Sequence, residues 1–276
     1  MSTLRGKHVL VTGPTTGIGR EIALELAALG ADLTLGCRSR ERGERAAAEL
    51  RAVPGAGAVE VLDVDTSSQR SIRDAARTLR DRRPRLDVLV NNAGVAPGER
   101  SVSVDGIELT FATNVLGYFL LTNELLGALR ASAPARIVNV ASMFAGELDL
   151  ADLEFEHRRY DVLEAYAQSK ACDRLLTWAL ARRLVGTGVT ANAYAPGFVA
   201  DTELTRTFPA RLKAAYATRT GRTVRQGADT AVWLASSPAL DGVSGRFFMD
   251  RREVPCEFRD EALEDALWAA CERYVA

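Results

Sequence analysis

The chain has 276 residues, of which 47% are hydrophobic and 26% are charged, and its formal net charge is -1. This balance excludes the strongly basic surface of a nucleic-acid-binding protein, and the length fits one α/β domain. The first apolar run begins too early for a signal peptide, and no window holds the ~20 apolar residues of a membrane span. We therefore expect a cytoplasmic protein with no membrane span.

Short apolar runs alternate with longer amphipathic stretches, which is typical of successive βα units in a parallel sheet. We expect a single domain over residues 1–276, a Rossmann-type, doubly wound parallel α/β sheet of about seven strands with helices on both faces and a C-terminal helical extension over 250–276. The strands are expected at residues 8–12, 32–37, 59–63, 86–90, 136–140, 189–194 and 246–249. The helices are expected at residues 17–29, 40–51, 68–80, 105–130, 162–184, 226–235 and 260–274.

The first expected strand runs into Thr12-Gly13-Pro14-Thr15-Thr16-Gly17-Ile18-Gly19 and then a helix. Glycines at such a turn let the backbone approach a pyrophosphate, and a helix N-terminus supplies free N–H groups. An ordinary strand-to-helix turn is the alternative, but the correct flanking elements favour a dinucleotide site. Its predicted residues are Gly13, Thr15, Thr16, Gly17, Ile18 and Gly19.

The end of the second expected strand indicates which dinucleotide binds. An acidic residue there would bind the ribose 2′-hydroxyl of NAD, and a basic one the 2′-phosphate of NADP. The sequence has no carboxylate here, but it has Arg38 and Ser39, an arginine fork and a hydroxyl. These two residues favour NADP(H), unless Arg38 is only a solvated residue at a helix start.

Tyr166 and Lys170 lie four residues apart in an expected helix and so on one face. An ammonium near a phenol stabilises the phenolate, which suits a general acid/base. With six tyrosines and three lysines in 276 residues, only ~0.07 such pairs are expected by chance. The pair is therefore a stronger signal for catalysis than for an incidental surface contact. The four cysteines and two histidines show no metal-ligand spacing, so no metal is expected.

With these motifs, the sequence resembles the short-chain dehydrogenase/reductase family from about Gly6 to Met249. The ordered matches are Thr12-Gly13 with Gly17-Ile18-Gly19, Asp63-Val64, Asn91-Asn92-Ala93-Gly94, Asn114, Ser142, Tyr166 with Lys170, and Pro196-Gly197. The 147–163 insert and the tail over 247–274 look like the retinol-dehydrogenase-like branch, which commonly prefers NADP. Many animal members of that branch carry a membrane anchor.

The resemblance implies a role for each matching residue. Tyr166 would exchange a proton with the substrate oxygen, and Ser142 would hydrogen-bond the same oxygen. Lys170 would bind the nicotinamide ribose and tune Tyr166, and Asn114 would hold a water that relays protons through Lys170. The residues implied to border the cofactor are Asp63, Val64, Asn91, Ala93, Gly94, Pro196, Gly197 and Val199, together with Tyr166 and Lys170. Thr202 is one residue out of register with the family's threonine and is left out.

Residues 199–222 are expected to form a substrate lid, with Leu204, Phe208, Leu212 and Tyr216 either roofing the substrate or packing on the domain. Met143, Phe144 and Tyr194 favour a lipophilic pocket. We therefore expect reduction of a lipophilic or aromatic carbonyl by NADPH, or the reverse reaction. The alternatives are a redox-assisted epimerase or dehydratase and a non-catalytic NADP sensor. The expected partner is a small carbonyl or alcohol substrate, and a homo-oligomer is possible.

Overall fold

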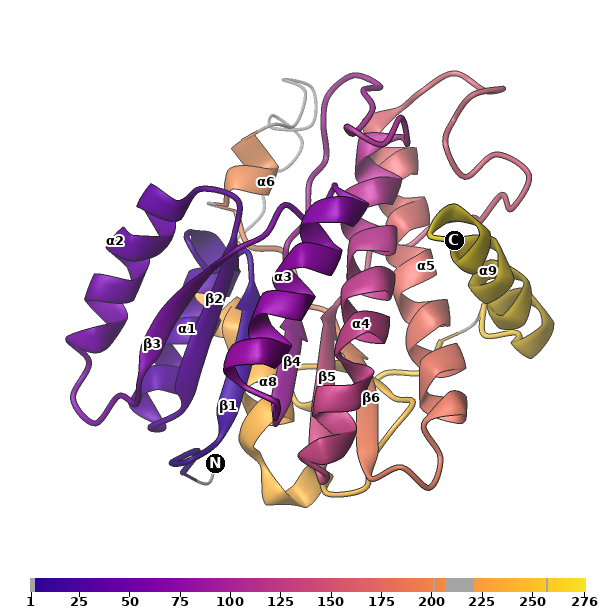
Figure 1. Cartoon of the computed structure of the whole chain (residues 1–276). Helices are drawn as coiled ribbons and strands as arrows, with labels where there is room; N and C mark the ends of the chain where they lie inside the picture. The colour runs from indigo at the N-terminus through magenta and orange to yellow at the C-terminus, as the bar shows by residue number, and fades with distance from the viewer. Residues whose placement is uncertain (1–2, 201, 207–220, 257) are drawn as a thin grey trace.

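The sheet at the centre of the molecule is nearly all parallel. The computed structural model describes residues 3–200, 202–206, 221–256 and 258–276. Their strands pair in the order β3-β2-β1-β4-β5-β6-β7-β8, and only the last pair is antiparallel. Figure 1 shows the order from β3 to β6. The strands are β1 (His8–Thr12), β2 (Asp32–Cys37), β3 (Val59–Asp63), β4 (Val88–Asn91), β5 (Ala135–Val140), β6 (Val189–Tyr194), β7 (Phe247–Met249) and β8 (Arg252–Glu253).

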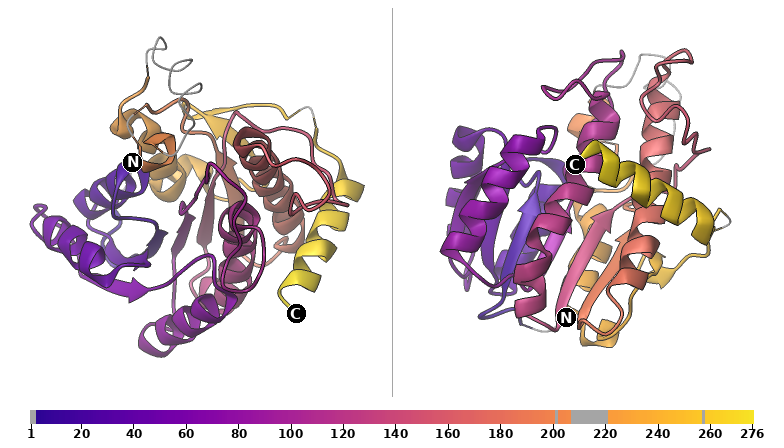
Figure 2. Two further views of the ribbon diagram at one scale, coloured as in Figure 1. Left: turned by 90° about the horizontal axis from the view of Figure 1, so that it is seen from above. Right: turned by 45° about the vertical axis from the view of Figure 1, so that its right-hand side comes forward.

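Helices cover both faces of this sheet (Figure 2). Helices α3, α4 and α5 pack on one face, and α1, α2 and α8 pack on the other. The helical segments are α1 (Gly17–Ala28), α2 (Arg40–Arg51), α3 (Gln69–Arg82), the π-helix η1 (Phe111–Leu116), α4 (Gly117–Ala131), α5 (Val162–Arg183), α6 (Glu203–Arg206), α8 (Val224–Ser236), the 3₁₀ turn η2 (Pro238–Leu240) and α9 (Glu261–Tyr274).

The apolar strands explain why both faces are covered. In β1, Val9, Leu10 and Val11 are all fully buried. Because side chains alternate across a strand, Leu10 packs with the α3–α5 face while Val9 and Val11 pack with the α1–α8 face. The doubly wound α/β fold expected from the sequence is therefore confirmed.

The structure has one strand more than expected. Arg252 and Glu253 form a two-residue antiparallel strand on β7 after a turn in which Asp250 and Arg251 have φ angles of 53° and 58°. A strand of two residues is too short to show an alternating pattern in the sequence.

The helix expected over 105–130 starts later than predicted. Gly106 has a φ of 78°, and Val102 pairs with Glu108 in an isolated antiparallel bridge. The Glu108 carboxylate then accepts the backbone N–H groups of Thr110 (2.8 Å) and Phe111 (2.7 Å), so it caps the helical segment that begins at Leu109. From Phe111 this segment continues as the π-helix η1, a geometry often found at functional sites.

The C-terminal helix α9 packs across α5, as Figure 2 shows from the side. The Trp268 ring meets Phe119 edge to face at 4.8 Å between centroids, and the Tyr274 ring meets Phe111 at 5.1 Å. The C-terminal extension thus belongs to the core of the same domain. Among the described residues, every helix is too short or too polar to cross a membrane.

Candidate active site

A cleft of about 620 Å³ opens beyond the carboxyl ends of β1 and β4, where the strand order reverses. Ligands of doubly wound sheets bind at such a switch point. The predicted site residues that line it are Gly13, Thr15, Thr16, Gly17, Ile18, Gly19, Arg38, Ser39, Val64, Ala93, Gly94, Ser142, Tyr166, Lys170, Pro196, Gly197 and Val199. Three more predicted residues, Asp63, Asn91 and Asn114, lie outside this lining.

The glycine turn after β1 has no room for a side chain at Gly13 or Gly19. Gly13 has a φ of 64°, which favours glycine, and a Cβ there would lie 3.0 Å from the Ala93 Cα. A Cβ on Gly19 would lie 2.2 Å from the Gly13 carbonyl oxygen and 2.3 Å from the Asn92 Nδ2. Only glycine lets the backbone fold this tightly beside the cleft.

The N-terminus of α1 points free N–H groups at this turn. Thr16 is the N-cap of α1, but its side chain makes no capping hydrogen bond. In the described part of the chain, the N-cap side chains of α2, α3, α5, α8 and α9 all do accept such a bond. The uncapped donors and the helix dipole form a site for an anion such as a pyrophosphate.

Arginines surround the other end of the cleft. Arg38 is exposed and has no carboxylate within ion-pair distance among the described residues, whereas Arg42 pairs with Glu203 at 2.6 Å. Ser39 caps α2 by accepting the N–H of Arg42 at 3.3 Å. Arg38 is therefore a cation available to a ligand in the cleft.

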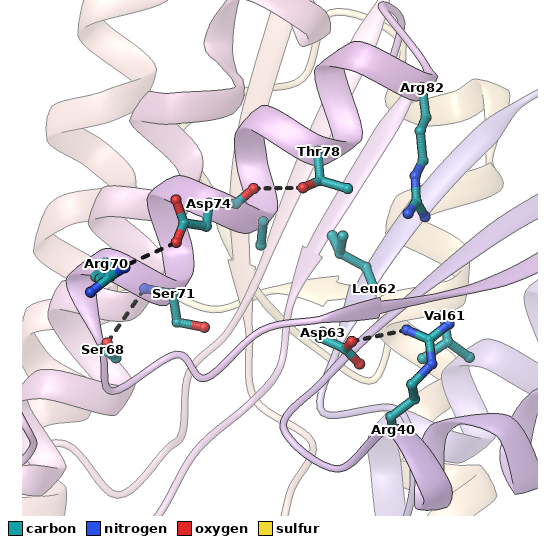
Figure 3. A pocket seen from close by; sticks show the side chains of 11 residues that line it. Arg40, Val61, Leu62, Asp63, Ser68, Arg70, Ser71, Asp74, Thr78 and Arg82 are labelled. Carbon is teal, nitrogen blue, oxygen red and sulfur yellow. Dashed lines mark hydrogen bonds and ion pairs between the residues drawn. The ribbon is translucent and has the colours of Figure 1, made fainter.

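Asp63 faces away from the cleft, toward Arg40. Its Oδ2 lies 2.9 Å from the Arg40 Nη1, beside a separate hollow of about 450 Å³ between β3 and α3 (Figure 3). Its neighbour Val64 is buried and lines the main cleft. The side-chain alternation along the end of β3 thus brings only one of these two residues to the cleft.

Tyr166 and Lys170 enter the cleft from α5. No described residue hydrogen-bonds the Tyr166 hydroxyl, and the Lys170 Nζ lies 5.8 Å from the centroid of the Tyr166 ring. Ser142 follows β5 and lines the same cleft, and its Oγ accepts the N–H of Phe144 at 3.0 Å. Because the Ser142 Oγ is the acceptor in that bond, its own hydrogen remains able to donate to a ligand.

Asn114 ties the elements around the cleft together. Its Oδ1 accepts the Val95 N–H at 2.8 Å, and its Nδ2 donates to the Val95 carbonyl and to the Ser169 Oγ, both at 3.0 Å. The Ser169 Oγ in turn donates to the Tyr166 carbonyl at 2.7 Å. Asn114 is fully buried, so its side chain holds the loop after β4 against α5.

Asn91 is also fully buried, and its amide donates to Thr122 (3.0 Å) and Asn139 (2.8 Å). The next residue, Asn92, was absent from the predicted site, yet it lines the cleft and its Nδ2 donates to the carbonyls of Thr12 (2.9 Å) and Gly13 (3.2 Å). The doubled asparagine was the available signal, but the sequence alone does not show which of the two faces the turn.

The apolar end of the cleft differs in part from expectation. Met143 and Phe144 line it and remain 47% and 45% exposed, whereas Tyr194 is fully buried in the core on the α1–α8 face. The prediction that Tyr194 faces the pocket is therefore wrong, because its side chain points from β6 into the core on the α1–α8 face.

Thr202, which was left out of the predicted site, lines the cleft. Of the four apolar lid residues, Phe208, Leu212 and Tyr216 lie outside the described residues, and Leu204 lines the cleft.

Known proteins resemble the whole chain. Residues 7–213 match the short chain dehydrogenase family. Retinol dehydrogenase 14 of Homo sapiens is 40% identical over 99% of this chain and 87% of its own length. A solved structure from Mycobacterium Paratuberculosis is 32% identical, with a TM-score of 0.79 and coverage of 100% and 95% of the two chains. The Pseudomonas aeruginosa RhlG/NADP active-site complex is 33% identical, with a TM-score of 0.71 and coverage of 89% and 95%.

Proposed function

The chain belongs to the short-chain dehydrogenase/reductase family, on its retinol-dehydrogenase-like branch, and on this premise we propose that it is an NADP(H)-dependent oxidoreductase for lipophilic carbonyls or alcohols. The observation that carries the proposal is the meeting, in one cleft, of the glycine turn with the Tyr166 phenol, which no described residue hydrogen-bonds, and the nearby Lys170 ammonium. Hydride exchange at a CH–OH or C=O group uses a nucleotide site together with an acid/base at the substrate oxygen, and this cleft offers one of each.

The cleft fits a nicotinamide dinucleotide. Its volume lies within the usual range for ligand sites, roughly 300–1,000 Å³, and the missing Cβ atoms at Gly13 and Gly19 allow the tight turn that brings the start of α1 to the cleft. When bound, the nicotinamide supplies or accepts a hydride. Thr15, Thr16 and Gly17 at the start of α1 would hold the phosphates, and Lys170 would hold the nicotinamide ribose.

Tyr166 is the proposed proton donor and acceptor. Its hydroxyl gives a proton to the oxygen of a carbonyl that is being reduced, or takes one from an alcohol that is being oxidised. The Lys170 ammonium stabilises the phenolate that forms. Ser142 donates its hydroxyl hydrogen to the same substrate oxygen and so fixes the reacting group against Tyr166.

Asn114 supports this machinery from outside the cleft lining. Both of its N–H groups are used by Val95 and Ser169, which leaves one acceptor position on Oδ1 for a water. Its proposed role is to hold the loop after β4 and α5 in register, and a relay water at Lys170 would rest on this frame.

Arg38 supports NADP over NAD. Its planar guanidinium can bind a 2′-phosphate with two hydrogen bonds, and no described carboxylate neutralises it. The solved complex of the Pseudomonas aeruginosa relative contains NADP, which agrees with this choice.

The substrate class is proposed from the apolar end of the cleft. Met143 and Phe144 are large apolar side chains that remain about half exposed there, and Leu109, Leu163 and Phe198 line the same cleft. Such a surface favours a substrate with an extended apolar or aromatic body. The name of the human relative, a retinol dehydrogenase, points to the same chemical class.

The experiment is to follow NADPH absorbance with a panel of lipophilic aldehydes and ketones, including retinal and polycyclic aromatic ketones. Tyr166→Phe should lower the rate by about 10²–10⁴-fold while NADPH still binds. Tyr160→Phe is the matched control, because the Tyr160 hydroxyl donates to the Pro97 carbonyl at 3.0 Å outside the cleft lining. Equal rates in the wild type and Tyr166→Phe would refute the proposed chemistry.

A further inference from the structure

Lys170 has a buried anionic partner that the proposed mechanism does not use. Its Nζ donates to the Asp173 Oδ2 at 2.7 Å and to the Val140 carbonyl at 2.9 Å. The two charged side chains are only 5% and 1% exposed. Because an ammonium has three N–H groups, these contacts fix two of them and leave the third for the cleft, which Lys170 lines.

Lys170 is the only cation among the described titratable groups that interact with Asp173. Burial raises the pKa of Asp173 above its ordinary value, and the Lys170 ammonium 2.7 Å away opposes this rise because it stabilises the carboxylate. The other groups are neutral phenols and thiols, since burial raises their pKa values. These groups are Tyr118 of α4, Cys172 of α5 and Cys271 of α9, and Tyr194, whose pKa burial also raises, lies near Tyr118.

Asp173 also lines a small cavity with both polar and apolar walls. No described residue donates a hydrogen bond to the Asp173 Oδ1. The cavity has a volume of about 20 Å³ and is lined among others by Tyr118, Thr122 and Asn139. That volume is enough for one water, since roughly 10–15 Å³ suffices, and the Tyr118 hydroxyl, which no described residue hydrogen-bonds, belongs to the same lining. Such a water would stabilise the ionised carboxylate.

We infer that Asp173 is a positioning residue for the proposed reaction, which holds Lys170 as an ammonium and orients it toward the cleft. This inference rests on the proposed function and deepens it. A buried lysine without an anionic partner favours its neutral form, because desolvation penalises the charge. A neutral amine would stabilise the Tyr166 phenolate far less than an ammonium does.

Removal of the carboxylate also removes a negative charge, which by itself would favour the phenolate. This opposing effect is smaller. Along α5 the backbone of Asp173 is seven residues from Tyr166, about 10 Å of helix rise, whereas that of Lys170 is four residues away, about 6 Å, and the Lys170 Nζ lies 5.8 Å from the Tyr166 ring. Loss of the nearer positive charge therefore outweighs loss of the carboxylate, and the net effect of the substitution is a less stable Tyr166 phenolate.

The first test is the pH profile of alcohol oxidation in Asp173→Asn. The asparagine amide oxygen can still accept a bond from Lys170, so the geometry is kept and the charge is removed. We expect the midpoint of the kcat profile to move up by about one pH unit. At a fixed pH below the midpoint, this shift lowers the rate of alcohol oxidation about tenfold. The KM for the cofactor should change much less than kcat.

The matched control is Asp87→Asn. Asp87 binds Lys7 at 2.8 Å and is also buried, but it lies at the opposite end of the sheet from the cleft. This variant should keep the wild-type midpoint. An Asp173→Asn midpoint that is unchanged or lower would overturn the inference.

A second test is independent of any substrate. The chain has only three lysines, so the Nζ of Lys170 can be assigned in protein labelled with ¹⁵N-lysine by comparison with Lys170→Met. In Asp173→Asn, we expect the Lys170 amine to lose its proton at least one pH unit lower than in the wild type. Identical titrations would overturn the inference.

Asp173→Ser is the substitute if the asparagine variant does not fold, with the same expected shift. The two tests also separate the two proposals. An NMR shift in an enzyme that oxidises none of the alcohols tested would count against the proposed function alone. Wild-type turnover with no shift in either test would count against the role of Asp173 alone.

Discussion

Gly19→Ala should disrupt the nucleotide turn. The new Cβ would lie 2.2 Å from the Gly13 carbonyl oxygen and 2.3 Å from the Asn92 Nδ2, both far inside van der Waals contact. The Asn92 amide bonds the carbonyls of Thr12 and Gly13, so the added methyl group pushes against the contacts that hold the turn. The turn must therefore move, and Asn92 must leave its place.

The magnitude follows from two contributions. Overpacking of a tight site costs about 1–3 kcal/mol, and the two hydrogen bonds of Asn92 contribute about 1 kcal/mol each. The free energy of unfolding should fall by about 3–5 kcal/mol. At about 2 °C per kcal/mol for a domain of this size, Tm should fall by about 6–10 °C. The Kd for NADPH should rise at least about tenfold, which corresponds to 1.4 kcal/mol of lost binding.

The assay is thermal unfolding together with titration of NADPH fluorescence, with Gly127→Ala as the matched control. Gly127 lies in α4, and its Cβ would meet nothing within 4 Å, so alanine there should be neutral or stabilising by up to about 1 kcal/mol. If Gly19→Ala melted with the wild type and bound NADPH equally well, the steric account of the turn would be refuted.

Three further predictions address the cofactor, pH and the C-terminal helix. Arg38→Ala should raise the Kd for NADPH about 10- to 100-fold and leave the Kd for NADH unchanged, because a hydrogen bond to a charged group contributes ~1.5–3 kcal/mol. If Arg40→Ala raised the Kd for NADPH equally in the same titration, a specific role of Arg38 in binding the 2′-phosphate would be contradicted. Burial lowers the pKa of His8 from its ordinary value of 6.5, so its contribution to stability is present above pH 6.5 and is lost as the pH falls below it; urea unfolding of His8→Asn should lack this acid-side loss between pH 7 and 5. Trp268→Ala should cost about 3–5 kcal/mol in urea unfolding, because the indole is 8% exposed against Phe119, whereas Val185→Ala at an 82% exposed position should change little; similar losses would argue against α9 as part of the core.

The sequence by itself determined the architecture, the glycine turn of the nucleotide site and the pair Tyr166 and Lys170. Strands at residues 8–12 and 189–194 were predicted with their observed bounds, and the apolar run Val9 to Val11 in the first of them indicates a sheet buried on both faces. The glycine turn and the pair Tyr166 and Lys170 were also visible, because a positive φ and a spacing of four residues are local constraints. Such features depend only on neighbouring residues.

Only the tertiary structure decided which way individual side chains face and what they touch. Asn92 rather than Asn91 holds the glycine turn, and Tyr194 packs into the core instead of the cleft. In the sequence, Asp173 looks like an ordinary helical aspartate. Its pairing with Lys170 becomes important in the structure, because β5 brings the Val140 carbonyl to Lys170 and the surrounding helices bury the pair. These contacts join residues up to 80 positions apart, as between Thr12 and Asn92, and their strength depends on burial. A local pattern carries neither the partner nor the burial, because both arise only when the sheet and its helices pack together.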